Sequence, residues 1–346
     1  MAGAAAVWIH RASTVAMDQT GVLRRVPFGI CANRKAPGVL VGGLAPRRTL
    51  PGQPLATRLL TAMARNYPQP FPPPWAEAWG DDRYGLWAEL LVKGVTQRLR
   101  WVAPGSFEMG SPATQDGHQS NESPQHTVTF TQDLWLADTA CTQALWQAVM
   151  GKNPSYVTDD LQKPVEQVNW DDVQQFFTAL QGAGPDFLPP GVEAVLPTEA
   201  EWEYACRADE LRAYSFGESI DRNQVNFGSN GSWSKRLGAK QTTVPVKALP
   251  ANRWGLYQMH GNVWEWCADA MRPYTADAVA DPSGATGKDV KRFAVRGGSW
   301  FSIALYARSA LRHQVVRDWR SSYFGFRFAL RSNSQAGAGG PRPAGA

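Results

Sequence analysis

The stretch Arg296–Trp300 reads Arg-Gly-Gly-Ser-Trp, and it decides the fold together with Gly261–Trp266, which reads Gly-Asn-Val-Trp-Glu-Trp. A Gly-Gly pair adopts backbone conformations and close approaches that other residues resist, so Gly297 and Gly298 indicate a crowded turn. Tryptophan buries a large apolar surface, and the chain holds 15 of them. Those of the two stretches are interpreted as core residues rather than ligand contacts: Trp264, Trp266 and Trp300.

Three further sequence motifs lie before or after these two stretches. Trp101–Ser111 reads Trp-Val-Ala-Pro-Gly-Ser-Phe-Glu-Met-Gly-Ser, Leu196–Cys206 reads Leu-Pro-Thr-Glu-Ala-Glu-Trp-Glu-Tyr-Ala-Cys, and Gly325–Arg327 reads Gly-Phe-Arg. In this order, over about residues 75–332, the five strings resemble the formylglycine-generating enzyme / sulfatase-modifying factor family. The resemblance implies an α+β variant of the C-type lectin fold, with few helices, short strands, much irregular structure and a tryptophan-rich core.

Local patterns agree with this fold class. Alternating residues predict strands over Gln97–Val102, Ser106–Met109 and His126–Phe130. Helical spacing predicts Thr142–Met150 and Asp171–Leu180. A third helix opens at Thr198 with a capping box to Glu201 and ends near Arg207, and the rest of the domain shows no helical pattern.

The chain divides by composition into a basic Pro/Ala/Gly-rich arm (1–70), a main domain (71–332) and a Gly/Pro/Ala tail (333–346), which is expected to be disordered. The arm contains one weakly helical stretch, Leu55–Ala64, and nine basic residues against the single acid Asp18. Since the whole chain carries +5, residues 71–346 sum to −3. The pattern favours a flexible tail, and the alternative is an arm that contacts nucleic acid or an acidic partner.

The cysteines are few and far apart: Cys31, Cys141, Cys206 and Cys267. This spacing does not form a disulfide framework and favours a reducing, cytoplasmic location. The sequence indicates neither a signal peptide nor a stretch long enough to span a membrane.

Family enzymes oxidise a substrate cysteine with copper held by two cysteines shortly after the Gly-Gly-Ser-Trp string. The matching positions here are Ser302 and Ala307, which supply no thiolate for Cu(I). We therefore expect that the protein binds no copper, and the sequence favours a non-catalytic protein over an enzyme. The open alternative is an oxidoreductase or related sulfur-chemistry enzyme with a metal, which would have to recruit Cys206 or Cys267. The five histidines show no metal-ligand spacing.

The resemblance also implies a calcium loop. Its ligands would be the carbonyls of Gly261 and Val263 and the carboxylate of Glu265, which are the oxygen donors that calcium requires. The fourth position, usually Asn in the family, holds Gln258. The alternative is that Glu265 pairs with an arginine such as Arg327.

The segment between Trp300 and Gly325 resembles the variable proteins of diversity-generating retroelements, which carry their ligand-binding residues there on the same fold. Its aromatic residues are interspersed with Arg308, Arg312, Arg317 and Arg320, a composition typical of binding hot spots. Gln314 and Trp319 cannot arise by adenine mutagenesis of asparagine codons and would stay constant. The alternative is an ordinary fixed segment. The candidate ligand-binding residues lie at about 301–324: Phe301, Ser302, Ile303, Leu305, Tyr306, His313, Val315, Val316, Ser321, Ser322, Tyr323 and Phe324.

The sequence thus predicts a non-catalytic protein that binds a protein or another macromolecule through this segment, with aromatic and arginine side chains making the contacts.

Overall fold

A computed structural model of the chain describes residues 15–17, 23–25, 68, 70–182, 187–228 and 242–332. The chain divides into two compact units, Met1–Pro74 and Trp75–Ala346. In the first unit, β1 (Val15–Met17) and β2 (Leu23–Arg25) pair antiparallel, which the sequence did not indicate. The predicted helical stretch Leu55–Ala64 and the tail 333–346 lie outside the described residues. The boundaries at 70 and 332 stay predictions.

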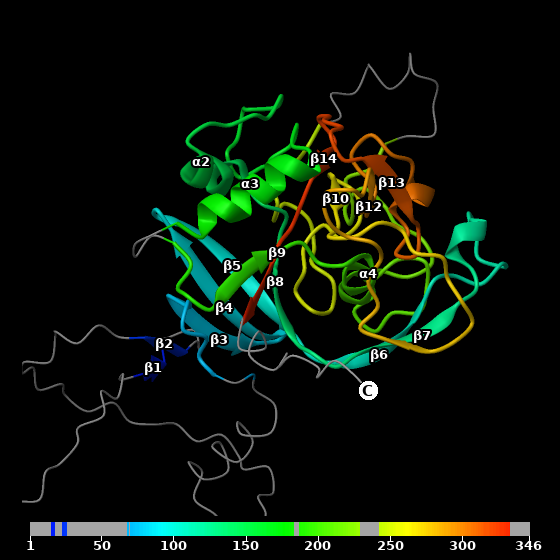
Figure 1. Cartoon of the computed structure of the whole chain (residues 1–346), viewed down its shortest axis with the longest axis horizontal. Coiled ribbons are helices and arrows are strands. Elements are labelled where there is room, and N and C mark those ends of the chain that lie inside the picture. The colour runs from blue at the N-terminus through cyan, green and yellow to red at the C-terminus, as the bar shows by residue number, and fades with distance from the viewer. Residues whose placement is uncertain are drawn as a thin grey trace, which may run out of the picture. The chain divides into compact units, whose positions relative to one another are not determined.

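The second unit begins with a six-stranded sheet of order β3-β4-β5-β8-β15-β9 (Figure 1). Its hydrogen-bonded neighbours are antiparallel, and β15, the last strand of the domain, lies between β8 and β9. The strands are β3 (Ala78–Asp82), β4 (Gly85–Val92), β5 (Val95–Val102), β8 (Leu134–Ala137), β9 (Val192–Val195) and β15 (Ala329–Ser332).

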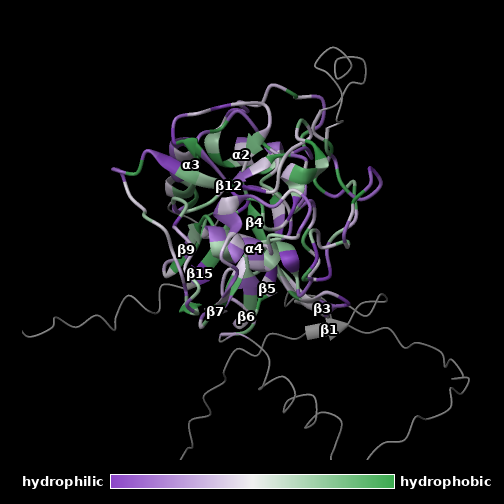
Figure 2. Ribbon diagram, turned by 90° about the vertical axis from the view of Figure 1, so that its right-hand side faces the viewer, coloured by the Kyte–Doolittle hydropathy of each residue, from purple (hydrophilic) through white to green (hydrophobic). Residues whose placement is uncertain are grey.

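Two helices pack against one another beside this sheet: α2 (Gln143–Met150) contacts β4 and β5, and α3 (Trp170–Leu180) contacts β9 (Figure 1). Both helices carry apolar residues on one face and polar residues on the other (Figure 2). Their apolar rings stack in the core, with Trp146 and Phe176 parallel at 5.2 Å between ring centroids.

Two smaller sheets and the helix α4 (Glu199–Arg207) complete the unit. A four-stranded sheet has the order β13-β12-β10-β14, and a three-stranded sheet has the order β11-β7-β6. The remaining elements are β6 (Gly105–Met109), η1 (Ser120–Glu122), β7 (His126–Phe130), β10 (Trp264–Trp266), β11 (Val279–Ala280), β12 (Arg292–Arg296), η2 (Ala304–Ala307), β13 (His313–Val316) and β14 (Phe324–Gly325).

Ion pairs hold this part of the unit together from inside. Arg296 and Glu203 pair with neither side chain exposed to solvent. Arg327 pairs with Glu265 at 2.6 Å, and both are also buried. Each charge has its partner, as buried charges require, so removal of one member leaves the other uncompensated.

The helices and strands that were predicted from short local sequence patterns are confirmed by the structure. β7 begins and ends as predicted, β5 and β6 contain the predicted strands, and α2, α3 and α4 match within one or two residues. Thr198 caps α4 through the predicted capping box with Glu201. Gly151 closes α2 in the left-handed conformation, at φ +78°. The α+β class with few helices and short strands is confirmed. Within the described ranges, no helix is long and apolar enough to cross a membrane.

Candidate ligand-binding site

The segment that follows β12 is fixed to the scaffold at both of its ends. Gly297 and Gly298 adopt φ of +94° and +72°, and a Cβ on Gly298 would lie 2.9 Å from the Tyr306 carbonyl oxygen. Trp300 then donates its indole N–H to the carbonyl of Ser322 at 3.0 Å, which joins the start of the segment to its end. The Trp264 backbone N–H donates to the Tyr323 carbonyl at 2.8 Å. The crowded glycine turn is therefore confirmed, and it places both ends of the segment beside β10.

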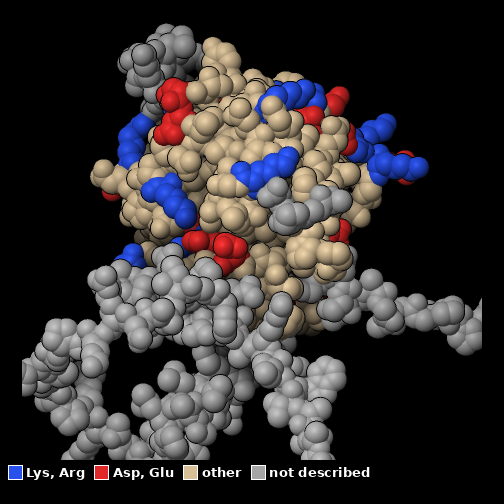
Figure 3. Space-filling model, turned by 90° about the vertical axis from the view of Figure 1, so that its left-hand side faces the viewer, with Lys and Arg blue, Asp and Glu red and all other residues tan. Residues whose placement is uncertain are grey.

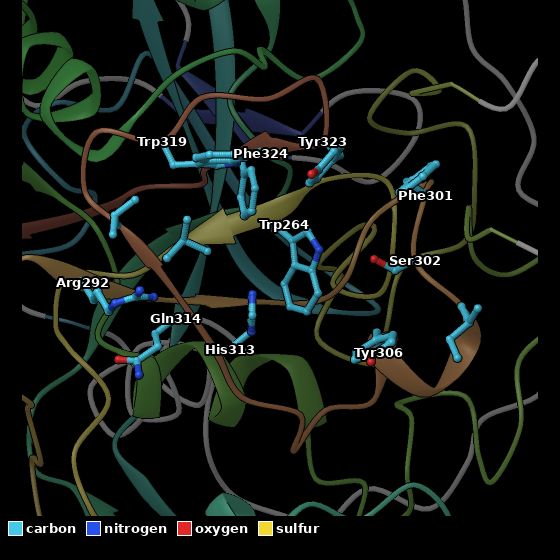
Figure 4. Close-up of a pocket in the computed structure, with 13 residues that line it drawn as sticks. Trp264, Arg292, Phe301, Ser302, Tyr306, His313, Gln314, Trp319, Tyr323 and Phe324 are labelled. Atoms are coloured by element: carbon cyan, nitrogen blue, oxygen red, sulfur yellow. The ribbon is translucent and has the colours of Figure 1, made fainter. Parts of the chain in front are cut away.

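Between these ends the segment surrounds a cavity of about 570 Å³ (Figure 4). Nine of the candidate residues line it: Phe301, Ser302, Ile303, Tyr306, His313, Val315, Val316, Tyr323 and Phe324. The other lining residues are Trp264, Arg292, Gln314 and Trp319. The candidate residues that the sequence grouped by position are therefore largely brought together in space.

The other three candidates have different surroundings. Leu305 packs over Gly117, where an added Cβ would lie 3.0 Å from Leu305 Cδ2. The Ser321 carbonyl accepts the Gln167 backbone N–H at 3.1 Å, and the Ser322 carbonyl accepts the Trp300 indole. These two serines thus hold the segment to the scaffold through their backbones, and Leu305 lies on its outer side.

Aromatic rings form most of the cavity wall. The rings of Phe301 and Tyr323 are nearly parallel with centroids 5.8 Å apart, and Trp264 faces His313 at 5.6 Å (Figure 4). Tyr306 and Trp319 keep 45% and 48% of their surface exposed. Large rings that face water around a hollow are the composition of a ligand site rather than of a core.

Part of the lining belongs to the core. Phe324 is 3% exposed and stacks on Trp266, and Val315 is 9% exposed. Trp264 is 6% exposed, so it packs as a core residue as expected, but it also lines the cavity. Trp266 has no exposed surface, and its indole N–H donates to the Val168 carbonyl at 3.0 Å. The cavity therefore combines a buried base with an exposed rim.

The expectation that the segment's arginines supply ligand contacts is wrong for the two that lie inside the domain. Arg308 is 1% exposed and donates to Glu122 at 2.7 and 2.8 Å. Arg312 is equally buried and is paired with Glu199. Burial of the two guanidinium groups requires these carboxylates, which come from distant parts of the sequence.

The two remaining arginines of the segment lie nearer the surface, and α3 neutralises both. Arg317 pairs with Asp171. Arg320 pairs with Asp172 at 2.7 and 2.8 Å, and half of its side chain is exposed. None of the four arginines lines the cavity.

Among the lining residues that the structure describes, the cation is Arg292, which was not a candidate predicted from the sequence. It begins β12, directly opposite Val316 of β13 in the antiparallel register, and its side chain points into the cavity beside Gln314 (Figure 4). Arg292 precedes the Gly-Gly-Ser-Trp string, so a search confined to the segment after it could not find the residue. The short apolar run Phe293–Val295, which lies between Arg292 and Arg296, is the signal that could have placed Arg292 at the start of a strand.

The cavity contains a serine where family enzymes carry a copper-binding cysteine. Ser302 Oγ lies 3.0 Å from Ser299 Oγ and accepts the Ser299 backbone N–H at 3.2 Å. Ala307, at the second position, is fully buried. Neither side chain can bind Cu(I) as a thiolate would.

Cys206 and Cys267, which could replace the missing copper-binding cysteines, are buried in the domain. Burial raises the pKa of the Cys206 thiol to about 12, and it raises the pKa of Cys267 well above its usual range. Both side chains have no exposed surface. Because the thiolate is the nucleophile and the metal ligand, these residues behave as small apolar side chains.

The residues proposed for calcium lie next to the cavity but are engaged elsewhere. Glu265 Oε2 accepts the Arg327 Nε–H at 2.6 Å and the Trp202 indole N–H at 2.7 Å, and Oε1 accepts from Arg327 at 2.8 Å. The Gln258 side-chain oxygen accepts from Asn262. Arg327 thus has the structural pairing expected for it. Both carboxylate oxygens of Glu265 are thus engaged by protein donors, and calcium binding by the Gly261, Val263 and Glu265 set stays a prediction.

The histidines also have structural surroundings. His260 is buried, with Nδ1 2.6 Å from the Ala307 carbonyl oxygen and Nε2 accepting the Ser215 backbone N–H at 3.0 Å. Burial lowers its pKa to about 4. Within the part of the chain that the structure describes, no group of three or more His, Cys, Asp or Glu could hold a metal ion.

Comparison with known proteins identifies the family of the chain. Residues 93–332 match the model of the sulfatase-modifying factor enzyme 1-like domain, so the chain belongs to this family. It is 30% identical over 236 residues to the formylglycine-generating enzyme of Streptomyces coelicolor, covering 62% of this chain and 69% of that protein. It is 40% identical over 139 residues to the serine/threonine-protein kinase pkn1 of Chlamydia caviae, covering 39% of this chain. The chain spans only 20% of that kinase.

Among solved structures, the domain is similar to variable protein 1 of Treponema denticola. The TM-score is 0.58 with 26% sequence identity, and the match covers 71% of this chain and 99% of that protein. The expected fold of the formylglycine-generating enzyme type is therefore confirmed, in a form that a variable protein also adopts.

Proposed function

We propose that this is a non-catalytic ligand-binding protein, in which the segment from Phe301 to Phe324 presents a binding cavity on a lectin-like scaffold. The observation that carries this proposal is the exposed aromatic lining of the 570 Å³ cavity, most of which comes from that one segment. The segment's buried arginines form ion pairs with the scaffold, so the lining can change without loss of the framework. The ligand is a protein or another macromolecule.

We further propose that the segment is diversified by a retroelement. The likeness to Treponema denticola variable protein 1 supports this, because it extends over nearly all of that protein. The division within the segment supports it as well. Positions such as Phe301 and Tyr306 face the cavity, whereas Arg308 and Arg312 hold the fold.

The second candidate is a family oxidoreductase. The curated relatives favour it, since several are formylglycine-generating enzymes. Ser302 and Ala307 argue against it, as do the buried thiols of Cys206 and Cys267. Cu(I) binding by the purified protein that is lost in C206S or C267S would support the enzyme. Absence of binding would support the ligand-binding protein.

The proposal is tested by replacing Phe301, Tyr306 and Tyr323 with alanine together. If the three rings serve a ligand rather than the core, the melting temperature should fall by no more than about 5 °C. As a control, Phe326→Ala removes a ring with no exposed surface. That loss should cost about 3–5 kcal/mol and lower the melting temperature much further. A collapse of the triple variant as deep as that of the control would contradict the proposal.

A further inference from the structure

We infer that the cavity recognises a protein partner that inserts an apolar or aromatic side chain next to a carboxylate, and that Arg292 binds this carboxylate. The inference rests on the proposed function, because it names the chemistry of the ligand for the same cavity. Its basis is the charge of the lining, which the proposed function does not use.

The guanidinium of Arg292 is the uncompensated charge of the site. Among the described residues it forms no ion pair and no side-chain hydrogen bond, and the residue is exposed. All four arginines of the neighbouring segment have a carboxylate partner. An arginine that lacks such a partner beside an apolar hollow is placed to receive a carboxylate from outside, through two parallel hydrogen bonds.

The described part of the cavity lining contains no competing acid, since it includes neither Asp nor Glu. The carboxylates of Asp171 and Asp172 are held by Arg317 and Arg320. Burial, together with the charge of Arg292, lowers the pKa of His313, so this imidazole is neutral at pH 7. Among the described lining residues, Arg292 therefore provides the one positive charge.

The rest of the lining fits an apolar group attached to that carboxylate. Trp264, Tyr323 and Phe301 present ring faces and edges, and the hydroxyl of Ser302 and the amide of Gln314 offer hydrogen bonds near them (Figure 4). A volume of about 570 Å³ is large enough for one or two side chains of a partner. The chemistry thus matches a short stretch of polypeptide in which an acidic residue neighbours a large apolar one.

A nucleic acid is less well matched. Binding to a phosphate backbone depends on several cations along a groove. Here Arg292 is the single cation among the described lining residues, and the four arginines of the neighbouring segment are paired with carboxylates. Figure 3 draws the side that lies at the left in Figure 1, where β12 and β13 lie to the right; on this side, basic and acidic side chains are interspersed and no broad basic surface appears.

The experiment compares two dipeptides by ligand-observed NMR titration of the full chain: N-acetyl-Phe-Asp-amide and its neutral analogue N-acetyl-Phe-Asn-amide. Wild-type protein should bind the Asp peptide at least about tenfold more tightly than the Asn peptide. Arg292→Gln should remove this preference, so that the two peptides bind with similar affinities. The matched control is Lys291→Gln, which removes the adjacent exposed charge that does not line the cavity, and it should keep the preference.

Three results would overturn the inference. Equal binding of both peptides by wild-type protein would remove the role of Arg292 and leave the cavity as a ligand site, so the proposed function would stand. No binding of either peptide would contradict both the inference and the use of the cavity for apolar ligands. Tighter binding of a single-stranded oligothymidylate, lost in Arg292→Gln, would assign a nucleic acid in place of a protein. Melting curves of both variants establish that they are folded.

Discussion

Arg308 illustrates how the chemistry of a single residue depends on partners far away in the sequence. It stands among the exposed aromatic residues of the segment, yet its guanidinium is buried against Glu122 and donates to the Gly117 carbonyl. Its neighbour Tyr306 keeps 45% of its surface exposed. Two residues only two positions apart therefore have different roles: Arg308 belongs to the buried framework and Tyr306 to the cavity wall.

This difference predicts unequal costs for two chemically identical substitutions. Arg308→Met leaves the buried Glu122 carboxylate without its partner and should lower the unfolding free energy by about 3–5 kcal/mol. Arg320→Met breaks a half-exposed pair with Asp172 and should cost about 1 kcal/mol or less. Urea unfolding of both variants measures the difference. Similar costs would mean that Arg308 is not a framework residue.

The same residues explain which parts of the site the sequence could predict. The aromatic positions were found because they stand together between two recognisable strings. The arginines were misread because Glu122, Asp171 and Glu199 lie far from them along the chain, and one sequence does not reveal such pairs. Arg292 was missed for the related reason that a neighbouring strand, β12, supplies it to the cavity.

At the scale of elements, η2 is held in place by a histidine from another loop. His260 receives the Ser215 N–H at Nε2, so its proton resides on Nδ1 and is donated to the Ala307 carbonyl of η2. A second proton on Nε2 would face the Ser215 N–H and would also charge a buried ring. This position of η2 therefore requires a neutral His260.

This arrangement predicts acid sensitivity. The pKa of His260 falls from 6.5 in the unfolded chain to about 4 in the folded one, so its contribution is fully present above pH 6.5 and is lost toward pH 4. The loss should reach about 3 kcal/mol of unfolding free energy. Urea unfolding at pH 7.5 and pH 4.5 measures it. His260→Gln should lose less stability than wild type over this interval, and equal losses would contradict the role.

Elements with local signals were predicted well, and those with non-local signals were not. Thr198 with Glu201 and the glycine after Met150 mark helix ends within a few residues of sequence. The pairing of β15 between β8 and β9 joins strands distant in the chain, and no local pattern encodes it. The strands β3 and β4 were not predicted from the sequence.

At the scale of the whole molecule, the domain combines a buried framework with an exposed cavity lining. Buried ion pairs and glycine turns hold the segment after β12 at both ends, and exposed rings surround the cavity between them. A framework of this kind allows many linings to be presented without a new fold. The family's copper positions fall within this segment, at Ser302 in the cavity lining and at Ala307 in the buried framework.

The most direct test of this account is the DNA sequence that flanks the gene. We predict a near-copy of the stretch encoding Arg296–Phe328, differing mainly at adenines, beside a gene for a reverse transcriptase. The differing codons should fall at cavity positions such as Phe301, Tyr306 and Tyr323, and should spare Gln314 and Trp319. Absence of such a copy, or differences concentrated at Arg308 and Arg312, would contradict a diversified binding surface.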